Sequence, residues 1–326
     1  MPGRAVDEYR APLFLAWQLT NRCGARCITC CEESGPDKAW PDELGRAEAL
    51  ELARRIVAYG IPYVAFGGGE PLGAPHCWEL FELLAAGGVA LKIETDGSHI
   101  DDAAAERLVR LGIQCVQISV DGATAATHER VRPGSSFSAA ITAIRRLAAR
   151  GLAPQLVFVP TRWNLGDAKA TYDLAVELGC SAFVTGPLMR IGRAAANWDR
   201  IACGAEEWQA AVLELRRHAQ SRGATVELSI YPWDIPAELE QRLASPQAML
   251  LVVPNGKVKL LNALPFAPAD LRRDSLEQAW QAYRDAWRSR EVREFIAACR
   301  ADPALLRHAN ETWALKNGKK VSGTFS

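Results

Sequence analysis

Three cysteines lie close together near the amino terminus, at Cys23, Cys27 and Cys30, separated by three and then two residues. Thiolates are soft ligands that select zinc, copper(I) or iron–sulfur clusters. A structural zinc site needs a fourth ligand, but no C-x2-C or H-x3-H pair follows, and we expect the adjacent Cys31 to point away. Three thiolates suit a [4Fe–4S] cluster with one iron open to another ligand. On spacing alone, an iron–sulfur cluster, a zinc site and unrelated buried cysteines all stay open.

A second candidate is the glycine-rich segment Gly67-Gly68-Gly69-Glu70-Pro71, at the end of an expected strand. Glycines let the backbone approach a ligand closely, and exposed carbonyls there could accept hydrogen bonds from an ammonium group. The alternative is a tight turn between a strand and a helix. A phosphate-binding P-loop is a poor match, because no Gly-Lys-Ser/Thr follows.

The elements that must position these residues repeat one pattern: an amphipathic helix, a glycine, then a short β-rich run. Helices are expected at 46–59, 78–86, 103–111, 137–150, 168–178 and 206–222. Strands are expected at 15–20, 64–66, 91–95, 115–120, 156–159, 182–185 and 226–230. Glycine after a helix is the usual left-handed stop, and strands alternating with helices imply parallel βαβ units. Six units fit before about residue 200, which predicts an α/β fold with a partial (β/α)6 TIM-like barrel.

The pattern changes after about residue 224, where prolines become frequent. Two apolar runs, 250–253 and 257–261, flank Asn255-Gly256, which is typical of a β-hairpin. A closing helix is expected at 275–298. We therefore predict an N-terminal segment at 1–12, the barrel at 13–222, a small α+β domain at 223–315 and a flexible tail at 316–326.

Composition narrows the class of protein. The 326 residues contain 38 Lys+Arg and 38 Asp+Glu, for a formal net charge of zero, and 49% are hydrophobic. This balance argues against a disordered chain and against general attraction to nucleic acid. No run approaches the roughly 18 apolar residues of a membrane span, and no secretory signal is visible. Nine cysteines without an export signal argue against a disulfide framework, so we expect a cytoplasmic protein.

Taken together, the motifs resemble those of radical S-adenosylmethionine (radical SAM) enzymes. The resemblance covers roughly residues 14–193. It rests on the three cysteines after the first strand and on one motif after each of the next three strands: Gly68-Gly69-Glu70-Pro71, Thr95-Asp96-Gly97 and Ser119-Val120-Asp121-Gly122. Each motif falls at the carboxyl end of its strand, where barrel active sites are built.

The resemblance implies that Cys23, Cys27 and Cys30 hold one [4Fe–4S] cluster, whose open iron takes the amino and carboxylate groups of S-adenosylmethionine. It also implies a set of cofactor-binding residues: Gly67, Gly68, Gly69, Glu70, Thr95, Asp96, Ser119, Asp121, Arg132 and Asn164.

Within this set, residues 68–70 would meet the methionine ammonium, and Ser119 and Asp121 would face the ribose or the methionine end. Arg132 resembles an arginine of the peptide- and cofactor-tailoring branch. It could pair with the methionine carboxylate or be a solvated arginine at the start of a helix. Asn164 matches a common asparagine beyond the fifth strand.

Two positions depart from the family pattern. Thr29 stands before the third cysteine, where an aromatic residue usually packs against adenine. Asp96 stands where an asparagine is usual, so an acceptor-only carboxylate replaces an amide. Both changes concern the contacts to adenosine and not the cluster ligands.

The C-terminal region resembles the auxiliary-cluster (SPASM or twitch) domain of the same branch. Ser245 and Leu261 stand where that domain has cysteines, and only Cys299 remains downstream. One thiol cannot hold a cluster, so we expect a degenerate SPASM/twitch-like domain that closes the barrel and shapes a substrate pocket.

Four further residues stay ambiguous. Cys77 and Cys203 are candidate hydrogen-atom donors to a product radical, although free cysteines are mostly small buried hydrophobes. Arg190 and Arg193 follow the sixth strand; either could hold a substrate carboxylate or phosphate, or be solvated at the surface.

The activity implied by the resemblance is reductive cleavage of S-adenosylmethionine to a 5′-deoxyadenosyl radical that abstracts hydrogen from a substrate C–H bond. We expect maturation of a peptide natural product or biosynthesis of a cofactor. The alternatives are a sugar, nucleoside or lipid precursor as substrate, undergoing dehydrogenation, epimerisation or adenosylation, or a non-catalytic iron–sulfur or zinc protein. The expected partners are a flavodoxin- or ferredoxin-type reductant and a peptide or small-molecule substrate, with no nucleic acid and no membrane span.

Overall fold

The computed structural model describes residues 6–223 and 225–315. Its centre is one ten-stranded sheet with the order β10-β9-β8-β1-β2-β3-β4-β5-β6-β7. The strands are β1 (Phe14–Thr20), β2 (Tyr63–Gly68), β3 (Ala90–Thr95), β4 (Cys115–Ser119), β5 (Gln155–Phe158), β6 (Ala182–Thr185), β7 (Glu227–Ile230), β8 (Met249–Val252), β9 (Lys257–Lys259) and β10 (Ala269–Asp270).

The sheet confirms the α/β, TIM-like fold but extends it beyond six strands. β1 to β7 pair in parallel, each with the next, and β8 pairs in parallel with the free edge of β1. Eight strands are therefore parallel. The ring is not closed within the described residues, because β7 and β10 are the two ends of the sheet.

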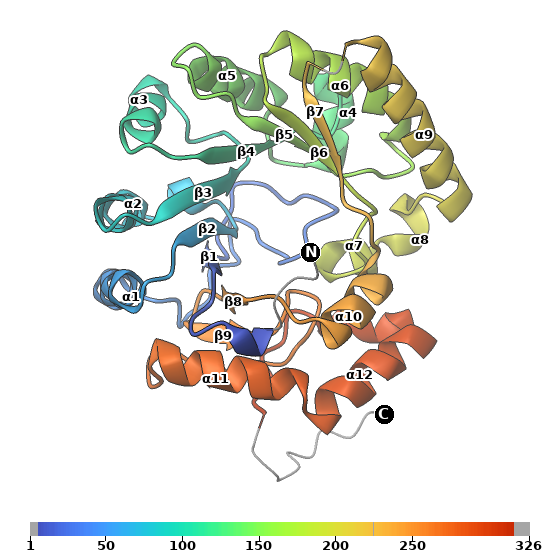
Figure 1. Cartoon of the computed structure of the whole chain (residues 1–326). Helices are drawn as coiled ribbons and strands as arrows, with labels where there is room; N and C mark the ends of the chain where they lie inside the picture. Colours follow the sequence, from blue (N-terminus) through green and yellow to red (C-terminus); the bar gives the residue numbers. More distant parts are fainter. Residues whose placement is uncertain (1–5, 224, 316–326) are drawn as a thin grey trace.

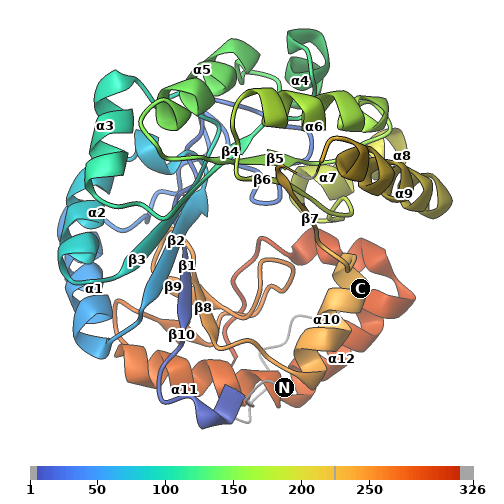
Figure 2. The ribbon, with the colours of Figure 1, turned by 45° about the horizontal axis from the view of Figure 1, so that its top comes forward.

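Most of the helices cover the outer side of this curved sheet (Figures 1 and 2). The helices are α1 (Arg46–Tyr59), α2 (Cys77–Ala86), α3 (Asp102–Arg110), α4 (Ala125–Val131), α5 (Phe137–Ala148), α6 (Ala168–Glu177), α7 (Gly192–Ala196), α8 (Trp198–Ile201), α9 (Ala205–Ser221), α10 (Ile235–Ala244), α11 (Leu276–Trp287) and α12 (Arg290–Ala301). The first helix has the expected bounds and ends at Gly60 with a φ of 81°, which confirms the glycine stop. The short helices α4, α7, α8 and α10 were not predicted, because they interrupt loops without a long apolar period.

The core lies between the sheet and these helices. Side chains alternate along a strand, and in β1 the residues Leu15, Trp17 and Leu19 are all buried. Trp17 stacks on Phe66 of β2, which packs on Phe81 of α2. In β1, β4 and β5 the other face points into the barrel, where residues are partly exposed.

The C-terminal region, residues 249–315, contains the expected hairpin. β8 and β9 are antiparallel around Asn255-Gly256. The prediction of one helix over 275–298 is wrong, because the chain breaks into α11 and α12. The hydroxyl of Ser289 accepts a hydrogen bond from the Val292 N–H at 3.3 Å, and such an N-cap begins a new helix.

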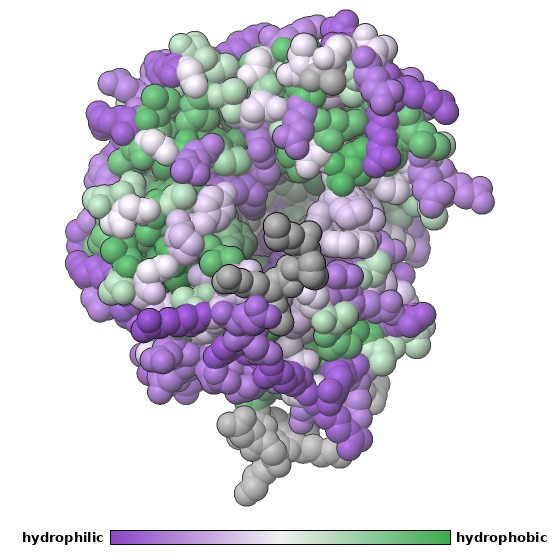
Figure 3. All heavy atoms as spheres, viewed as in Figure 1, coloured by the Kyte–Doolittle hydropathy of each residue, from purple (hydrophilic) through white to green (hydrophobic). Residues whose placement is uncertain are grey.

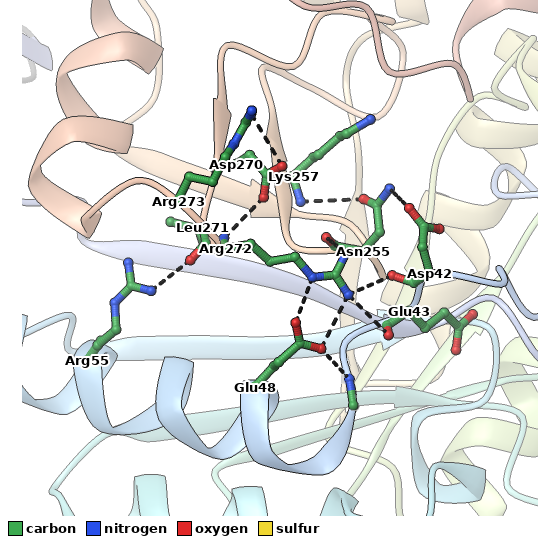
Figure 4. A network of polar contacts seen from close by, with 11 residues as sticks. Asp42, Glu43, Glu48, Arg55, Asn255, Lys257, Asp270, Leu271, Arg272 and Arg273 are labelled. Carbon is green, nitrogen blue, oxygen red and sulfur yellow. Dashed lines mark hydrogen bonds and ion pairs between the residues drawn. The ribbon is translucent and has the colours of Figure 1, made fainter.

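Arginine side chains join this region to the first part of the chain (Figure 4). Arg272 forms an ion pair with Glu48 of α1 at 2.7 Å and donates to the carbonyls of Asp42 and Glu43. Arg55 donates to the carbonyls of Leu271 and Asp274. The hairpin region is therefore attached to α1 and to the loop before it, as well as to β1.

None of the helices in residues 6–223 and 225–315 combines the length and the apolar character that crossing a membrane requires.

Candidate functional site

The predicted site residues meet in one cavity at the carboxyl ends of the strands. Its empty volume is about 750 Å³, part of it open to solvent, which is in the range of cofactor sites. The lining includes eleven of the predicted residues: Cys23, Cys27, Cys30, Gly67, Gly68, Gly69, Glu70, Thr95, Asp96, Ser119 and Arg132. Motifs far apart in sequence therefore converge as expected from parallel strands.

The cysteine loop, residues 21–45, runs from β1 to α1 and is tied down by its own backbone. The Cys23 N–H donates to the Gly35 carbonyl at 3.0 Å. Across the barrel mouth, the Arg26 and Ile28 N–H groups donate to the carbonyls of Pro133 and Val131. The loop thus has no helix or strand, but backbone hydrogen bonds hold it both within itself and to the segment at residues 131–133.

Arg193, at the start of α7, clamps this loop from the far side of the barrel. Its Nε donates to the Cys27 carbonyl at 2.7 Å, its Nη2 to the Ser34 carbonyl at 2.6 Å and its backbone N–H to the Cys30 carbonyl at 3.0 Å. Arg193 lines the cavity, but these bonds use its guanidinium to hold the loop. Arg190 instead lies over the Trp198 ring, 5.3 Å from its centroid.

All three cluster candidates are thiols whose burial opposes ionisation. Burial raises the pKa of Cys23 to about 12 and that of Cys30 to about 11, and it raises the pKa of Cys27 as well. The charge of Arg193 opposes this rise at Cys27 and Cys30. A metal centre supplies the positive charge that buried thiolates need.

Gly68 and Gly69 are required by close packing against backbone atoms. A Cβ on Gly69 would lie 2.1 Å from the Arg22 carbonyl oxygen, and Gly68 has a φ of 101°. The Gly69 and Glu70 N–H groups donate to the carbonyls of Thr20 and Arg22, at 2.7 and 2.9 Å. The glycine segment therefore lies directly against the start of the cysteine loop.

Glu70 is 3% exposed and is held by donors on both oxygens. It accepts from the N–H groups of Leu72 and Asp96, at 3.0 and 2.9 Å, and from the Thr95 hydroxyl at 2.9 Å. Burial nevertheless raises the pKa of Glu70 to about 8, and the Asp96 charge adds to the rise. A cation in the cavity would stabilise this carboxylate.

Arg132 carries a free donor. Its Nη1 forms an ion pair with Asp121 at 3.1 Å, but its buried Nε has no hydrogen-bond partner within the described residues. A buried unpaired N–H is costly, and it lies on a residue that lines the cavity. An acidic ligand group would satisfy it. Of the two alternatives for Arg132, the structure excludes the solvated one, because the side chain is 13% exposed.

Asp121 and Asn164 lie behind the cavity wall. Asp121 is fully buried and accepts from Arg132 and from the Val159 N–H at 2.7 Å. Asn164 donates to the carbonyls of Asp121 and Val159. Neither is a lining residue, so both position the residues that are.

Other predicted residues are not brought into the cavity. Cys77 is buried in the core at the start of α2, with its thiol 3.6 Å from the Leu72 carbonyl oxygen. Cys203 follows α8, and Cys31 is half-buried, with its thiol 4.0 Å from the Thr29 carbonyl oxygen. None of the three thiols lines the cavity.

The cavity also contains residues that the sequence analysis missed. Glu32 and Glu94 both line it. Glu94 could have been found from the alternation in the strand at 91–95, where it shares a face with Lys92. Glu32 lies in an irregular loop, and only its proximity to Cys30 in sequence would have pointed to it.

A single-ion site is not formed. Zinc ligands converge on one point about 2.0–2.3 Å away, and no three His, Cys, Asp or Glu side chains in the described residues are close enough for that. Three thiols that line one cavity, together with a glycine segment, an enclosed carboxylate and an unpaired arginine N–H, fit a larger group. The residues present therefore fit a cluster with a bound amino acid.

Comparisons with known proteins agree with this arrangement. Residues 17–175 match the model of the radical SAM superfamily. Over 203 residues, the chain is 36% identical to the mycofactocin maturase MftC of Mycobacterium ulcerans (61% of this chain, 54% of that protein). Over 185 residues, it is 30% identical to the AdoMet-dependent heme synthase of Methanosarcina barkeri (56% and 52%). The chain thus matches about half the length of these relatives.

Solved structures show the same fold. SuiB of Streptococcus suis, bound to its precursor peptide SuiA, superposes with a TM-score of 0.71 at 14% identity, covering 86% of this chain and 68% of SuiB. Native anSMEcpe with bound AdoMet superposes with a TM-score of 0.65 at 16% identity, covering 84% of this chain and 82% of anSMEcpe. The matched model, the cysteine motif and the fold together identify residues 17–175 as a radical SAM domain.

Proposed function

We propose that this protein is a radical SAM enzyme that matures a peptide natural product. Cys23, Cys27 and Cys30 would hold a [4Fe–4S] cluster, and S-adenosylmethionine would bind in the adjoining cavity. The observation that carries the proposal is that the three cysteines line one cavity with Glu70 and Arg132. When bound, the reduced cluster and S-adenosylmethionine supply hydrogen abstraction from an unactivated C–H bond.

Two residues have opposite charges suited to the two ends of a bound amino acid. The unpaired Nε of Arg132 would donate to the methionine carboxylate, as a charge-assisted hydrogen bond. Glu70 would face the methionine ammonium, whose charge would lower a pKa that burial now raises to about 8. Asp121 keeps Arg132 in place through their ion pair.

The loop contacts would orient the cysteines before the cluster binds. Arg193 holds the carbonyls of Cys27 and Ser34, and residues 68–70 hold the loop's first residues. Backbone held in this way would present the three thiols to the cavity before the cluster is assembled. A reductant of the flavodoxin or ferredoxin type would supply the electron.

The assignment of a peptide substrate rests on the relatives. One is a mycofactocin maturase, and SuiB was solved with a precursor peptide. The similarity to an AdoMet-dependent heme synthase supports cofactor biosynthesis as the second candidate. In both cases, the C-terminal region would act as a SPASM-like domain without its cluster, since Ser245 and Leu261 stand where that domain has cysteines. Ser245 instead caps α10, and Leu261 and Cys299 are buried.

The test is anaerobic reconstitution of the full chain with iron and sulfide, compared with Cys27→Ala and, as a matched control, Cys77→Ala. We expect four irons, cluster absorption and 5′-deoxyadenosine from the wild type and from Cys77→Ala, and none of these from Cys27→Ala. One zinc and no iron, or a Cys27→Ala variant that still forms 5′-deoxyadenosine, would contradict the proposal.

A further inference from the structure

The inside of the barrel is polar and accessible. Barrel interiors are usually filled by branched apolar side chains. Here the inward positions of β4 and β5 include Gln117 and Gln155, and both are partly exposed, whereas Val116, Ile118 and Leu156 on the outward face are fully buried. The molecular surface is also hollowed near the centre of the helical ring (Figure 3). Solvent-accessible polar groups in this interior are available to a ligand.

These inward polar residues lie in one row across the sheet. Gln18 of β1 is in register with Gly67 of β2. Further along, Glu94 of β3 is in register with Gln117 of β4, and Gln117 with Gln155 of β5. The row therefore places three carboxamides and one carboxylate on the same level of the barrel.

The row is continuous with the cysteine cavity. Gly67 and Glu94 line that cavity. A Cβ on Gly67 would lie 3.0 Å from the Glu94 Oε2, so the glycine leaves room for the carboxylate. At the other end of the row, the Gln18 Nε2 donates to Glu32 Oε1 at 3.3 Å, and Glu32 also lines the cavity.

Much of the row's hydrogen-bonding capacity is unused. Gln117 Nε2 donates to Gln155 Oε1 at 2.8 Å, and this is the one side-chain bond that either glutamine makes within the described part of the chain. A carboxamide has two N–H donors and an acceptor oxygen. Gln155 thus keeps both of its donors, and Gln117 keeps one donor and its oxygen.

The charges on this level nearly cancel. Glu94, whose side chain is 50% exposed, forms an ion pair with Lys92 at 2.7 Å. Lys259 is buried near Glu32 and carries the opposite charge. A strongly anionic or cationic ligand therefore has little to gain here, and an apolar ligand would leave the carboxamides unpaired.

We propose that the row formed by Gln18, Glu94, Gln117 and Gln155 binds the backbone amides of a peptide substrate. A carboxamide presents a donor and an acceptor side by side, as a peptide group does, so several in a row can pair with an extended chain. This inference deepens the proposed function: it names the surface of the same site that recognises the substrate.

The test uses photo-cross-linking of the purified full chain with a pool of randomised hexapeptides, each carrying a benzophenone at one end. Mass spectrometry locates the labelled residues, and neither cluster nor S-adenosylmethionine is needed. We expect labels on β3 to β5. The Gln117→Leu/Gln155→Leu double variant should lose roughly three- to tenfold in labelling, the equivalent of one to two net hydrogen bonds.

Two further variants separate binding from folding. Gln114→Leu makes the same change at an exposed residue just before β4 and should leave labelling unchanged. Gln155→Glu keeps the size and the acceptor for Gln117 but replaces the donors of residue 155 by a charged acceptor, and should also weaken labelling. Thermal melting checks that each variant is folded.

Labels elsewhere on the chain, equal loss in Gln114→Leu, or displacement of the peptides by sugars or nucleosides would overturn the inference. Its failure is distinguishable from that of the proposed function, because cleavage of S-adenosylmethionine is measured separately. A chain that cleaves S-adenosylmethionine but shows no labelling on these strands contradicts the peptide row alone. A chain that is labelled there but forms no 5′-deoxyadenosine contradicts the enzyme assignment alone.

Discussion

The cysteine loop and the C-terminal region both depend on β1, but they are held in different ways. The loop continues from the carboxyl end of β1 and has only an isolated β-bridge, from Arg22 to Gly35. The C-terminal region pairs along the edge of β1 through β8 and continues as a regular hairpin. The loop is held by close backbone approach and by the cavity-lining guanidinium of Arg193, and the C-terminal region by sheet pairing and by arginine side chains nearer the surface.

This difference predicts how each region responds to substitution. Close backbone approach tolerates no extra atom, because neither partner can move without breaking its own hydrogen bonds. Side-chain contacts near the surface can be replaced by water, so their loss costs less. A substitution that adds an atom in the cysteine loop should therefore cause a large loss of bound iron. A substitution in the C-terminal region should lower the free energy of unfolding by a smaller amount.

The largest effect is expected from Gly69→Ala. The new Cβ would lie 2.1 Å from the Arg22 carbonyl oxygen, a distance that the backbone can relieve only by moving the start of the cysteine loop. We expect loss of most of the iron bound after reconstitution. Gly24→Ala is the matched control, since a Cβ at this position meets nothing within 4 Å. Equal iron content in the two variants would show that close approach does not position the loop.

The next largest effect is expected at Arg193. Arg193→Met would leave the carbonyls of Cys27 and Ser34 without their donor, at a cost of about 1–3 kcal/mol for each buried group. Arg193→Lys keeps the charge but cannot reproduce the fork. We expect an iron chelator to remove the cluster faster from both variants than from the wild type, and fastest from Arg193→Met. Arg190→Met, in the same segment, should behave as the wild type does; if it does not, the clamp is not specific.

The same contrast explains what could be predicted from the sequence. The cysteines, the glycine segment and Glu70 were found because their spacing is local, and the order of strands brings local motifs together at one edge. The clamp by Arg193 was not found, because it joins residues 166 positions apart. Only the tertiary structure shows that this guanidinium holds loop carbonyls and is not free for a substrate anion.

The C-terminal region also contains one feature that the sequence predicts and two that it does not. Its hairpin could be predicted from the Asn-Gly turn. The pairing of β8 with β1 could not, because the two strands are separated by more than 200 residues and neither contains a motif that identifies the strand it pairs with. The break between α11 and α12 was missed because Leu276, Trp280, Tyr283 and Trp287 suggest one apolar face that continues past Ser289. A single hydroxyl cap ended the helix there.

The buried Lys259 makes the stability of the C-terminal region depend on pH. It is 3% exposed, it donates to the Ala309 carbonyl, and burial lowers its pKa to about 8. Between pH 8 and its ordinary value of 10.5, the unfolded chain holds a proton that the folded chain has released. Stability therefore rises with pH in this window and is lower below pH 8, where the buried ammonium is charged. Relative to Lys259→Met, the wild type should gain up to about 3 kcal/mol between pH 8 and 10.5. Denaturant unfolding at several pH values measures this gain, and parallel curves for the two proteins would exclude it.

The smallest effect is expected from Arg272→Met. Arg272 joins β10 to α1 and to the loop before it, through Glu48 and the carbonyls of Asp42 and Glu43 (Figure 4). Its side chain is 30% exposed, so water can replace part of what is lost, and we expect a loss of about 1–2 kcal/mol in the free energy of unfolding.

Arg273→Met is the control for Arg272→Met, because Arg273 is 77% exposed and pairs with Asp270 alone in the described residues; a change of less than about 0.5 kcal/mol is expected. Iron content should stay at the wild-type level in both variants, since β8 still pairs with β1. If Arg272→Met instead releases the cluster, the arginine contacts and not the strand pairing keep the cysteine loop in place. The C-terminal region would then belong to the cluster site itself, and its attachment would be as sensitive as the loop.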